Sequence, residues 1–326
     1  DELIDIREKY GDERHTQIKY EAANFRVEDT IPDDEVVITI SHKGYIKRTR
    51  LDEYRTQSRG GVGAKGSSVR SEDFVEHIFM ATNHNYLLLF TEMGRCYWMR
   101  AFEVPEGEKN SKGRPVLNMI NIDPNDKIKA YVNVSTLSDS EYVGNHYIVM
   151  CTKKGIIKKT TLEAYSRPRT NGIIAVGIRE GDELLTARLT DGNSQMLIAT
   201  RKGKLMRCSE DEFRSLGRGA SGVKGITLEG DDDEVIGMLC VNNNSTDEVL
   251  VVSDNGYGKR SDLEGYRTTH RGGKGVKTLQ ITDKTGLLSA IAMVNDENDL
   301  MIINRSGITI RLKAADLRVM GRNTQG

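Results

Sequence analysis

A glycine that follows a run of apolar residues recurs six times along this chain. The six glycines are Gly44, Gly94, Gly155, Gly203, Gly256 and Gly307, and their successive spacings are 50, 61, 48, 53 and 51 residues. Three residues before them stand Ser41, Thr91, Thr152, Thr200, Ser253 and Asn304. A hydroxyl or amide at the first position of a turn, with glycine at the fourth, is typical of a type I turn. The pattern therefore predicts six tight β-hairpins.

Each predicted hairpin is flanked by further apolar segments. DELLTARLT precedes the fourth hairpin and SGVKGITL follows it, for example, so each unit holds about four strands. Four-stranded units that repeat every ~50 residues are typical of a β-propeller. A pair of β-sandwiches is the alternative, but it would not require the same turn chemistry six times. We expect an all-β fold of six four-stranded blades over residues 31–326.

The first 30 residues differ from the repeats. Leu3, Ile6 and Tyr10 are spaced for one face of a helix, and Gly11 suits its end. We expect residues 1–30 to form the tail of a preceding domain, with a short helix, and a linker.

Composition excludes several classes of protein. Lys plus Arg is 47 and Asp plus Glu is 48, so bulk charge gives no argument for nucleic-acid binding. Cys96, Cys151, Cys208 and Cys240 form no CxxC pair, which excludes the usual zinc and disulfide patterns. The run Tyr86–Phe90 is far too short to span a membrane, and the charged N-terminal segment is unlike a signal peptide. We expect a cytoplasmic protein with no membrane partner.

Basic residues concentrate just after the repeat glycines. The third and fourth positions after each glycine hold 8 basic residues among 12, whereas random placement would give about 1.7, and no acidic residue occurs there. The third position includes Lys47, Lys158 and Lys259; the fourth holds Arg48, Trp98, Lys159, Arg207, Arg260 and Arg311. Strict alternation along a strand would place the side chain at the fourth position on the same face as the apolar side chain at the second. We therefore expect the basic side chains to emerge past the sheet edge. The pattern predicts a basic rim that contacts phosphates.

No catalytic motif accompanies the repeats. Gly61, Gly63 and Gly66 spell GxGxxG, but no helical periodicity follows them. The acidic run Glu229–Glu234 lacks the spacing of an EF-hand, and the histidines form no HExxH pattern. We therefore expect no catalytic residue, no metal site and no cofactor in this chain.

The segment QSRGGVG, Gln57 to Gly63, resembles the Q-R/K-R-G-G-R/K-G box found in the C-terminal domain of the A subunit of bacterial DNA gyrase. Gln57, Arg59, Gly60, Gly61 and Gly63 match the box, whereas Ser58 and Val62 depart from it. Lys65 lies two residues beyond and supplies one of the missing charges. HRGGKG, His270 to Gly275, is a partial second copy, and KYGDERHTQI, Lys9 to Ile18, is similar to the exit from the DNA-cleaving core.

This resemblance implies a six-bladed β-pinwheel, in which blades exchange strands, that wraps double-stranded DNA around its basic perimeter. It implies a non-catalytic part of an ATP-dependent enzyme that introduces negative supercoils, with the nucleophilic tyrosine, ATP and magnesium in other parts. Implied partners are the B subunit of gyrase together with a second A subunit, in an A2B2 heterotetramer. The alternatives are the matching domain of topoisomerase IV and a propeller that binds proteins. Our predicted DNA-binding residues are Lys47, Arg48, Arg59, Lys65, Arg95, Lys158, Lys159, Lys204, Arg207, Lys259, Arg260, Arg271, Lys274 and Arg311.

Overall fold

The computed structural model describes residues 2–12, 16, 26–51, 73–108, 110–304 and 309–326. The chain divides into two compact units, Asp1–Pro32 and Asp33–Gly326. The first unit contains the helix α1 (Glu2–Tyr10) and the 3-10 turn η1 (Val27–Thr30). The helix lies where the spacing of its apolar residues predicted it. Gly11 directly follows it and donates its N–H to the Arg7 carbonyl over 2.9 Å.

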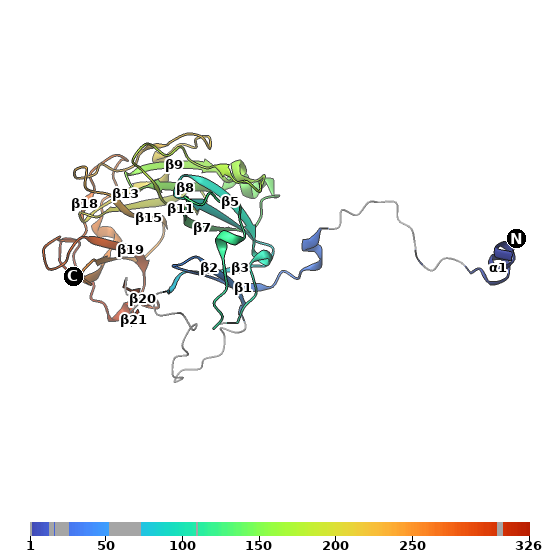
Figure 1. Ribbon diagram of the computed structural model, residues 1–326. Coiled ribbons are helices and arrows are strands. Elements are labelled where there is room, and N and C mark those ends of the chain that lie inside the picture. The colour runs from blue at the N-terminus through green and yellow to red at the C-terminus, as the bar shows by residue number, and fades with distance from the viewer. Residues whose placement is uncertain (1, 13–15, 17–25, 52–72, 109, 305–308) are drawn as a thin grey trace. The chain divides into compact units, whose positions relative to one another are not determined.

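The second unit is built on the six predicted hairpins (Figure 1). They are β1 (Glu35–Ser41) with β2 (Tyr45–Arg50), β4 (Tyr86–Thr91) with β5 (Arg95–Arg100), β8 (Tyr147–Thr152) with β9 (Ile156–Thr161), β12 (Ser194–Thr200) with β13 (Lys204–Ser209), β16 (Glu248–Ser253) with β17 (Gly258–Asp262), and β20 (Asp299–Ile303) with β21 (Thr309–Lys313). In each of the first five turns the hydroxyl accepts a backbone N–H four residues on, as Thr152 Oγ1 does from Ile156 over 3.1 Å. The turn glycines there have φ between +79° and +86°. The predicted turn chemistry is confirmed for these five; Gly307 lies outside the described residues.

Each blade takes strands from two successive repeats. The middle of each blade is one hairpin. A long strand pairs with the first strand of this hairpin and a short strand pairs with its second strand. Both the long and the short strand come from the following repeat, where they lie before and after the next hairpin in the sequence. The long strands are β3 (Val75–Thr82), β7 (Ile128–Val134), β11 (Leu184–Thr190), β15 (Val235–Asn242) and β19 (Leu288–Val294); the short strands are β6 (Arg114–Pro115), β10 (Ile173–Ile174), β14 (Val223–Lys224) and β18 (Val276–Lys277). Within the described residues this gives four sheets of four strands, one of three and one of two. The implied strand exchange is confirmed.

A glycine with positive φ stands directly before each short strand. Gly113, Gly172, Gly222 and Gly275 have φ between +67° and +99°. A Cβ at Gly222 would lie 2.4 Å from the Ile157 carbonyl oxygen, and one at Gly275 would lie 2.7 Å from the Leu205 carbonyl oxygen. Only glycine lets the next repeat approach a blade this closely.

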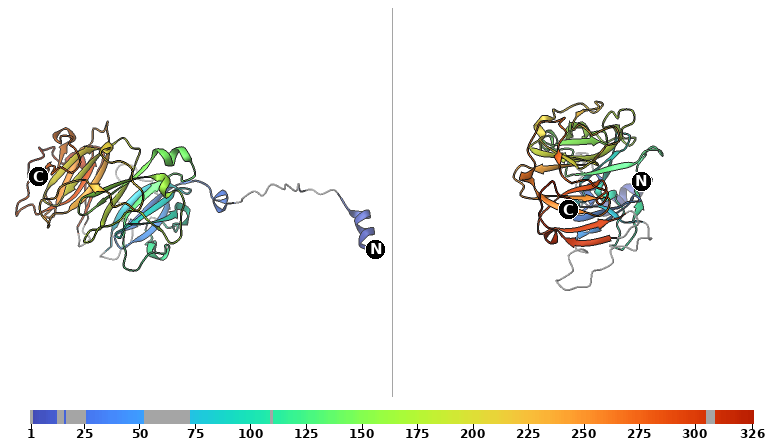
Figure 2. Two further views of the ribbon diagram at one scale, coloured as in Figure 1. Left: turned by 90° about the horizontal axis from the view of Figure 1, so that it is seen from above. Right: turned by 90° about the vertical axis from the view of Figure 1, so that its left-hand side faces the viewer.

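The long strands β7, β11, β15 and β19 lie at the inner side of the ring and the short strand β18 at its outer side (Figure 1), and in the other four-stranded sheets the short strand likewise forms the edge opposite the long one. β7, β11, β15 and β19 contact one another in sequence. At the face that carries the hairpin turns, the Leu184, Val235 and Leu288 N–H groups donate to carbonyls of the preceding blade over 2.8–3.0 Å. Figure 2 shows the unit from two further sides. Apolar side chains on both faces of the middle strands form buried clusters that include residues of neighbouring blades.

The acidic segments that precede the inner strands have a structural role. Asp73, Asp126, Asp182 and Asp233 each accept the N–H of the residue before a turn glycine, over 2.9–3.1 Å. Each carboxylate also accepts the N–H of the residue that follows it. The aspartates thereby join an inner strand to the turn of its own blade.

Short turns complete the unit. They are the helix α2 (Ser140–Asn145) and the 3-10 turns η3 (Ala101–Glu103), η4 (Val116–Asn118), η5 (Leu162–Tyr165), η6 (Glu210–Glu212), η7 (Leu263–Gly265) and η8 (Ala314–Asp316). Five of these 3-10 turns, η3 and η5 to η8, directly follow the second strand of a hairpin. From each of them the chain runs along the outer side of the preceding blade.

Candidate nucleic-acid interface

The expectation that the basic residues after the repeat glycines emerge past the sheet edge is wrong for most of them. Lys47, Lys158, Lys159, Lys259 and Arg260 are buried, with Lys158 and Lys259 only 1% exposed. Arg48 and Arg207 are half-buried. Their side chains do not emerge past the sheet edge, because the connection from the next repeat covers that edge. The five buried side chains are therefore not available as phosphate contacts.

The lysines at the third position hold these connections through backbone carbonyls. Lys47 Nζ donates to the Glu108 and Ser111 carbonyls over 3.2 and 2.9 Å. Lys259 Nζ donates to the Gly321, Arg322 and Thr324 carbonyls over 2.7–3.1 Å. Lys158 Nζ donates to the Ala175 carbonyl over 2.5 Å and to the Arg218 carbonyl. Each lysine donates hydrogen bonds to carbonyls of the repeat that follows its own. Lys158 also donates to a carbonyl of its own repeat, that of Ala175.

The fourth position acts in the same way. Arg48, Arg207 and Arg260 donate to carbonyls in the 3-10 turn of the next repeat or beside it, over 2.8–3.2 Å. Trp98, at the fourth position in β5, donates its indole N–H to the Tyr165 carbonyl over 3.0 Å. A tryptophan can stand here because its indole N–H supplies the same kind of donor to the turn of the next repeat.

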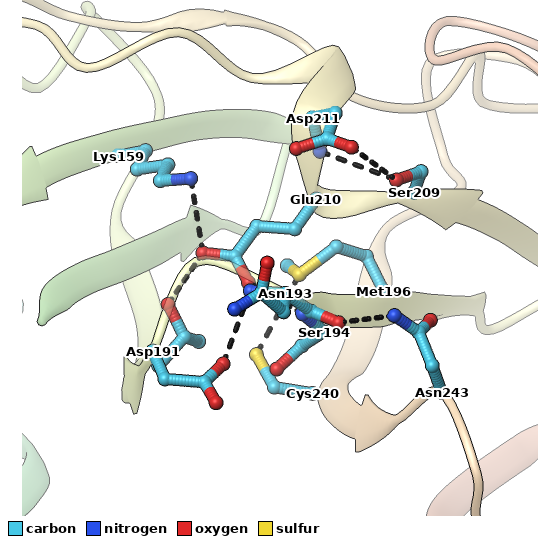
Figure 3. A network of polar contacts seen from close by, with 11 residues as sticks. Lys159, Asp191, Asn193, Ser194, Met196, Ser209, Glu210, Asp211, Cys240 and Asn243 are labelled. Carbon is cyan, nitrogen blue, oxygen red and sulfur yellow. Dashed lines mark hydrogen bonds and ion pairs between the residues drawn. The ribbon is translucent and has the colours of Figure 1, made fainter. Parts of the chain in front are cut away.

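Lys159 uses a carboxylate in place of a carbonyl (Figure 3). Its Nζ lies 3.1 Å from Glu210 Oε1, with the lysine side chain 8% exposed and the glutamate side chain 1% exposed. Glu210 also accepts the Thr190 hydroxyl and, over 3.0 Å, the Ser194 N–H. Lys159 Nζ lies 4.2 Å from the Tyr147 ring centroid. This buried ion pair joins β9 to the turn η6.

Lys158 makes the stability of the chain depend on pH. Burial, with a contribution from the Arg218 charge, lowers the pKa of Lys158 from 10.5 to about 7. Between these values the unfolded chain keeps a proton that the folded chain has lost, so the free energy of unfolding should rise with pH. Denaturant titrations of the native chain and a Lys158→Met variant should therefore diverge in favour of the native chain from pH 7 to 10. A constant difference would contradict the assignment.

Exposed basic side chains lie instead on the connections that cover the outer edges of the blades. We define the outer band as residues 105–116, 166–177, 214–227, 267–280 and 318–326. Its described residues include thirteen basic and two acidic side chains. The basic ones are Lys112, Arg114, Arg167, Arg169, Arg214, Arg218, Lys224, Arg267, Arg271, Lys274, Lys277, Arg318 and Arg322; all are exposed except Arg218 and Arg322, which are half-buried. The acidic ones are Glu106 and Glu108.

The five segments of the outer band adjoin one another. Asn121, just beyond the first segment, donates its side-chain amide to the Asn171 side chain over 2.8 Å. Backbone hydrogen bonds join Gly177 to Ala220, Gly272 to Gly225, and Gln280 to Thr324, over 2.7–3.1 Å. The exposed cations therefore follow a continuous path from blade to blade.

Some predicted residues do lie on this path. Arg271 and Lys274 are on the outer band and exposed, and Arg95 and Lys204 lie beside it at the hairpin edges that pair with β10 and β18. Arg311 is exposed but lies off the band in β21 and pairs with Asp299. Arg59, Lys65 and the box Gln57, Ser58, Arg59, Gly60, Gly61, Val62 and Gly63 lie outside the described residues.

Eleven basic residues of the band were absent from the sequence prediction. They are Lys112, Arg114, Arg167, Arg169, Arg214, Arg218, Lys224, Arg267, Lys277, Arg318 and Arg322. A charge count over the glycine-containing connections would have found them, since four of the five segments contain no acidic residue.

Exposed acidic side chains lie mainly off the outer band, at both faces of the ring. At the face opposite the hairpin turns they include Asp34, Glu141, Glu163, Asp191, Asp211, Glu264, Glu297 and Asp316, and at the face of the turns they include Glu229, Asp231, Asp232, Asp254 and Asp283. This sorting explains how a chain of net charge -1 presents a basic band.

Other chemistry has little support in the structure. Across the parts of the chain that the structure describes, no group of three His, Cys, Asp or Glu side chains could hold a metal ion. Burial raises the pKa of the Cys96, Cys208 and Cys240 thiols, so they are poor nucleophiles. No helix in the described ranges is long and apolar enough to cross a membrane.

Known proteins share both the repeats and the fold. The chain is 44% identical over 327 residues to the A subunit of DNA gyrase from Staphylococcus aureus strain COL and 43% identical to that from strain NCTC 8325. These matches cover 100% of this chain but 36% of either relative.

Two solved structures show the same fold. One, the crystal structure of the C-terminal domain of DNA topoisomerase IV, has a TM-score of 0.75 at 23% identity and covers 91% of this chain and 88% of that one. The other, the DNA gyrase A C-terminal domain, has a TM-score of 0.71 at 22% identity and covers 90% and 94%.

A family model described as "DNA gyrase C-terminal domain, beta-propeller" matches six successive segments. They are residues 35–82, 85–130, 146–191, 194–242, 247–295 and 298–326, one for each hairpin of the structure. The match covers most of the chain. The chain therefore belongs to the DNA gyrase C-terminal domain family of β-propellers.

Proposed function

We propose that the outer band binds double-stranded DNA without sequence preference and bends it around the blades. The observation that carries this proposal is a continuous path of thirteen described cations with two acidic residues. Contacts to phosphates position a duplex but carry little sequence information. The described residues of the propeller contain one helix, the six-residue α2, which is too short to read bases along a major groove.

Wrapping requires that contacts offset the bending of DNA. Turning a duplex of about 40 bp through about 180° costs on the order of 10 kcal/mol by elastic estimates. A dozen phosphate contacts are enough to supply this free energy at moderate salt. The same balance of backbone contacts against DNA stiffness holds DNA on histone octamers.

Membership of the gyrase family supports a wider role for this wrapping. We infer that the wrapped duplex is presented to a DNA-cleaving core, so that ATP-dependent strand passage introduces negative supercoils. The cleaving tyrosine, the magnesium ions and the ATPase would be supplied by other parts of a gyrase, and its B subunit with a second A subunit would complete it. Such an enzyme would act in the cytoplasm, where bacterial DNA lies.

The salt dependence of binding tests the proposal. With six or more phosphates neutralised, log affinity for a random-sequence duplex should fall against log salt with a slope of about -5 or steeper. A slope shallower than about -2, or strong preference for one sequence, would exclude wrapping on the band. No binding at all would favour a propeller that binds proteins.

A further inference from the structure

Basic side chains are unevenly spread along the outer band. At the outermost strand pair of blade 1, Tyr45 lies opposite Pro115, and in blade 2 Arg95 lies opposite Ile174. In blade 3 Ile156 lies opposite Lys224, and in blade 4 Lys204 lies opposite Lys277. With Arg114, which lies opposite Ile46 in blade 1, the strand pairs of blades 1, 2 and 3 each carry one cation, whereas that of blade 4 carries two.

Hydrogen bonds join further cations to the outermost strands of blades 3 and 4. The Arg271 guanidinium donates to the Lys224 carbonyl over 3.3 Å, and the Arg322 guanidinium donates to the Lys277 carbonyl over 3.1 Å. Lys274 lies in the same connection, between Arg271 and β18. We name these side chains the anchor patch: Lys204, Lys224, Arg271, Lys274, Lys277 and Arg322.

Few acids balance the anchor patch. Within the described residues none of its six side chains forms an ion pair. The nearby Glu212 accepts the His270 ring over 2.8 Å and the Arg271 backbone N–H over 3.4 Å. By contrast, both acidic residues of the outer band, Glu106 and Glu108, lie in the connection that covers blade 1.

The pairing of Lys204 with Lys277 has a cost in the free chain. Like charges directly opposite in an antiparallel pair destabilise a sheet. A polyanion bound across the two strands would remove this repulsion. The arrangement therefore favours a ligand with closely spaced negative charges, and B-DNA carries one about every 1.7 Å of its axis.

We propose that the anchor patch is where double-stranded DNA first binds, and that the duplex then extends along the outer band toward blade 1. This inference rests on the proposed function and adds an order of binding to it. The affinity of a short duplex depends on the cations within its reach, since each phosphate contact adds to the binding free energy. Within the described residues the anchor patch is the densest group of unbalanced cations, so we expect it to be occupied first.

The test compares two triple variants of the chain. The anchor variant carries Lys204→Gln, Lys274→Gln and Lys277→Gln. The control variant carries Arg114→Gln, Arg167→Gln and Arg169→Gln, which removes the same charge from exposed residues over blades 1 and 2. Both are titrated with a random duplex of about 12 bp, about 40 Å long, and with one of about 40 bp.

On the short duplex the anchor variant should lose affinity by on the order of 10²-fold, since three phosphate contacts are removed. The control variant should stay within about twofold on the short duplex and lose affinity only on the long one. Equal losses on the short duplex would overturn the inference while leaving the proposed function intact. Failure of the native chain to bind the long duplex would overturn both.

Folding is checked independently of DNA. Lys277→Gln removes a like-charge pair, so this variant should melt at or above the temperature of the native chain. A short duplex should also raise the melting temperature of the native chain more than that of the anchor variant. A lower melting temperature for Lys277→Gln would show that the Lys204–Lys277 repulsion is absent and would contradict the electrostatic basis of the patch.

Discussion

Replacing Arg114, Arg169, Lys224 and Lys277 together by glutamine should reduce the affinity of the chain for a random duplex of about 40 bp by roughly 10³-fold at 0.1 M salt. These exposed residues lie one to a blade on the outer band, over blades 1 to 4. Each lost phosphate contact should also make the plot of log affinity against log salt shallower by about 0.9. An electrophoretic or anisotropy titration at several salt concentrations measures both quantities.

The control for this variant removes four positive charges from the face of the ring that carries the hairpin turns. Lys43, Lys127, Arg179 and Lys284 are exposed near the hairpin turns and lie off the outer band. Their replacement by glutamine should change affinity by less than about tenfold, through the general loss of positive field. If the two quadruple variants lose affinity equally, DNA does not follow the band.

Replacing Lys159 by methionine should lower the free energy of unfolding by about 3–5 kcal/mol, the cost of leaving a buried carboxylate without its ion-pair partner. Glu210, 1% exposed, would keep only the Thr190 hydroxyl and the Ser194 N–H as donors. Chemical denaturation of the variant beside the native chain measures the loss. The folded variant should bind DNA with nearly native affinity, because Lys159 is covered by the next repeat.

A second substitution separates the ion pair from simple packing. A double variant with Lys159→Met and Glu210→Gln should recover a large part of the lost stability, since the neutral amide no longer requires a cation. Additive losses in the two single variants would mean that the pair does not act as a unit. If correctly folded Lys159→Met binds DNA more weakly than the native chain, Lys159 contacts DNA and this account of its role is wrong.

Sequence reasoning was sufficient for the repeats because the turns are local. A hydroxyl, a glycine three residues later and an apolar run on either side determine a hairpin without reference to the rest of the chain, and the first five turns have the expected bonds. The helix at the N-terminus was predictable for the same reason. The sequence did not reveal the hydrogen bonds from the turns to four aspartates, because each bond joins segments about 30 residues apart. These aspartates are Asp73, Asp126, Asp182 and Asp233.

The exposed basic residues could not be located from strand periodicity. Strands from the following repeat cover the edges of a hairpin, and the sequence of the hairpin alone does not show which residues they cover. Lys158 and Lys259 each lie three residues after a repeat glycine, the position at which we expected an exposed side chain. Their Nζ atoms instead donate to carbonyls of the following repeat. Trp98 was the one sign in the sequence that this position selects an N–H donor. The cations that remain exposed lie in irregular connections, where no periodicity marks them.

Wrapping, unlike DNA binding alone, changes the linking number of a closed circle, and this number measures wrapping most directly. Nicked plasmid is saturated with the chain, sealed with ligase, stripped of protein and separated by topology. The native chain should shift the linking number in one direction in proportion to the number of chains bound. The Arg114, Arg169, Lys224 and Lys277 quadruple variant, at concentrations that restore binding, should produce a much smaller shift. An unchanged linking number with native chain bound at saturation would show that the outer band holds DNA without wrapping it.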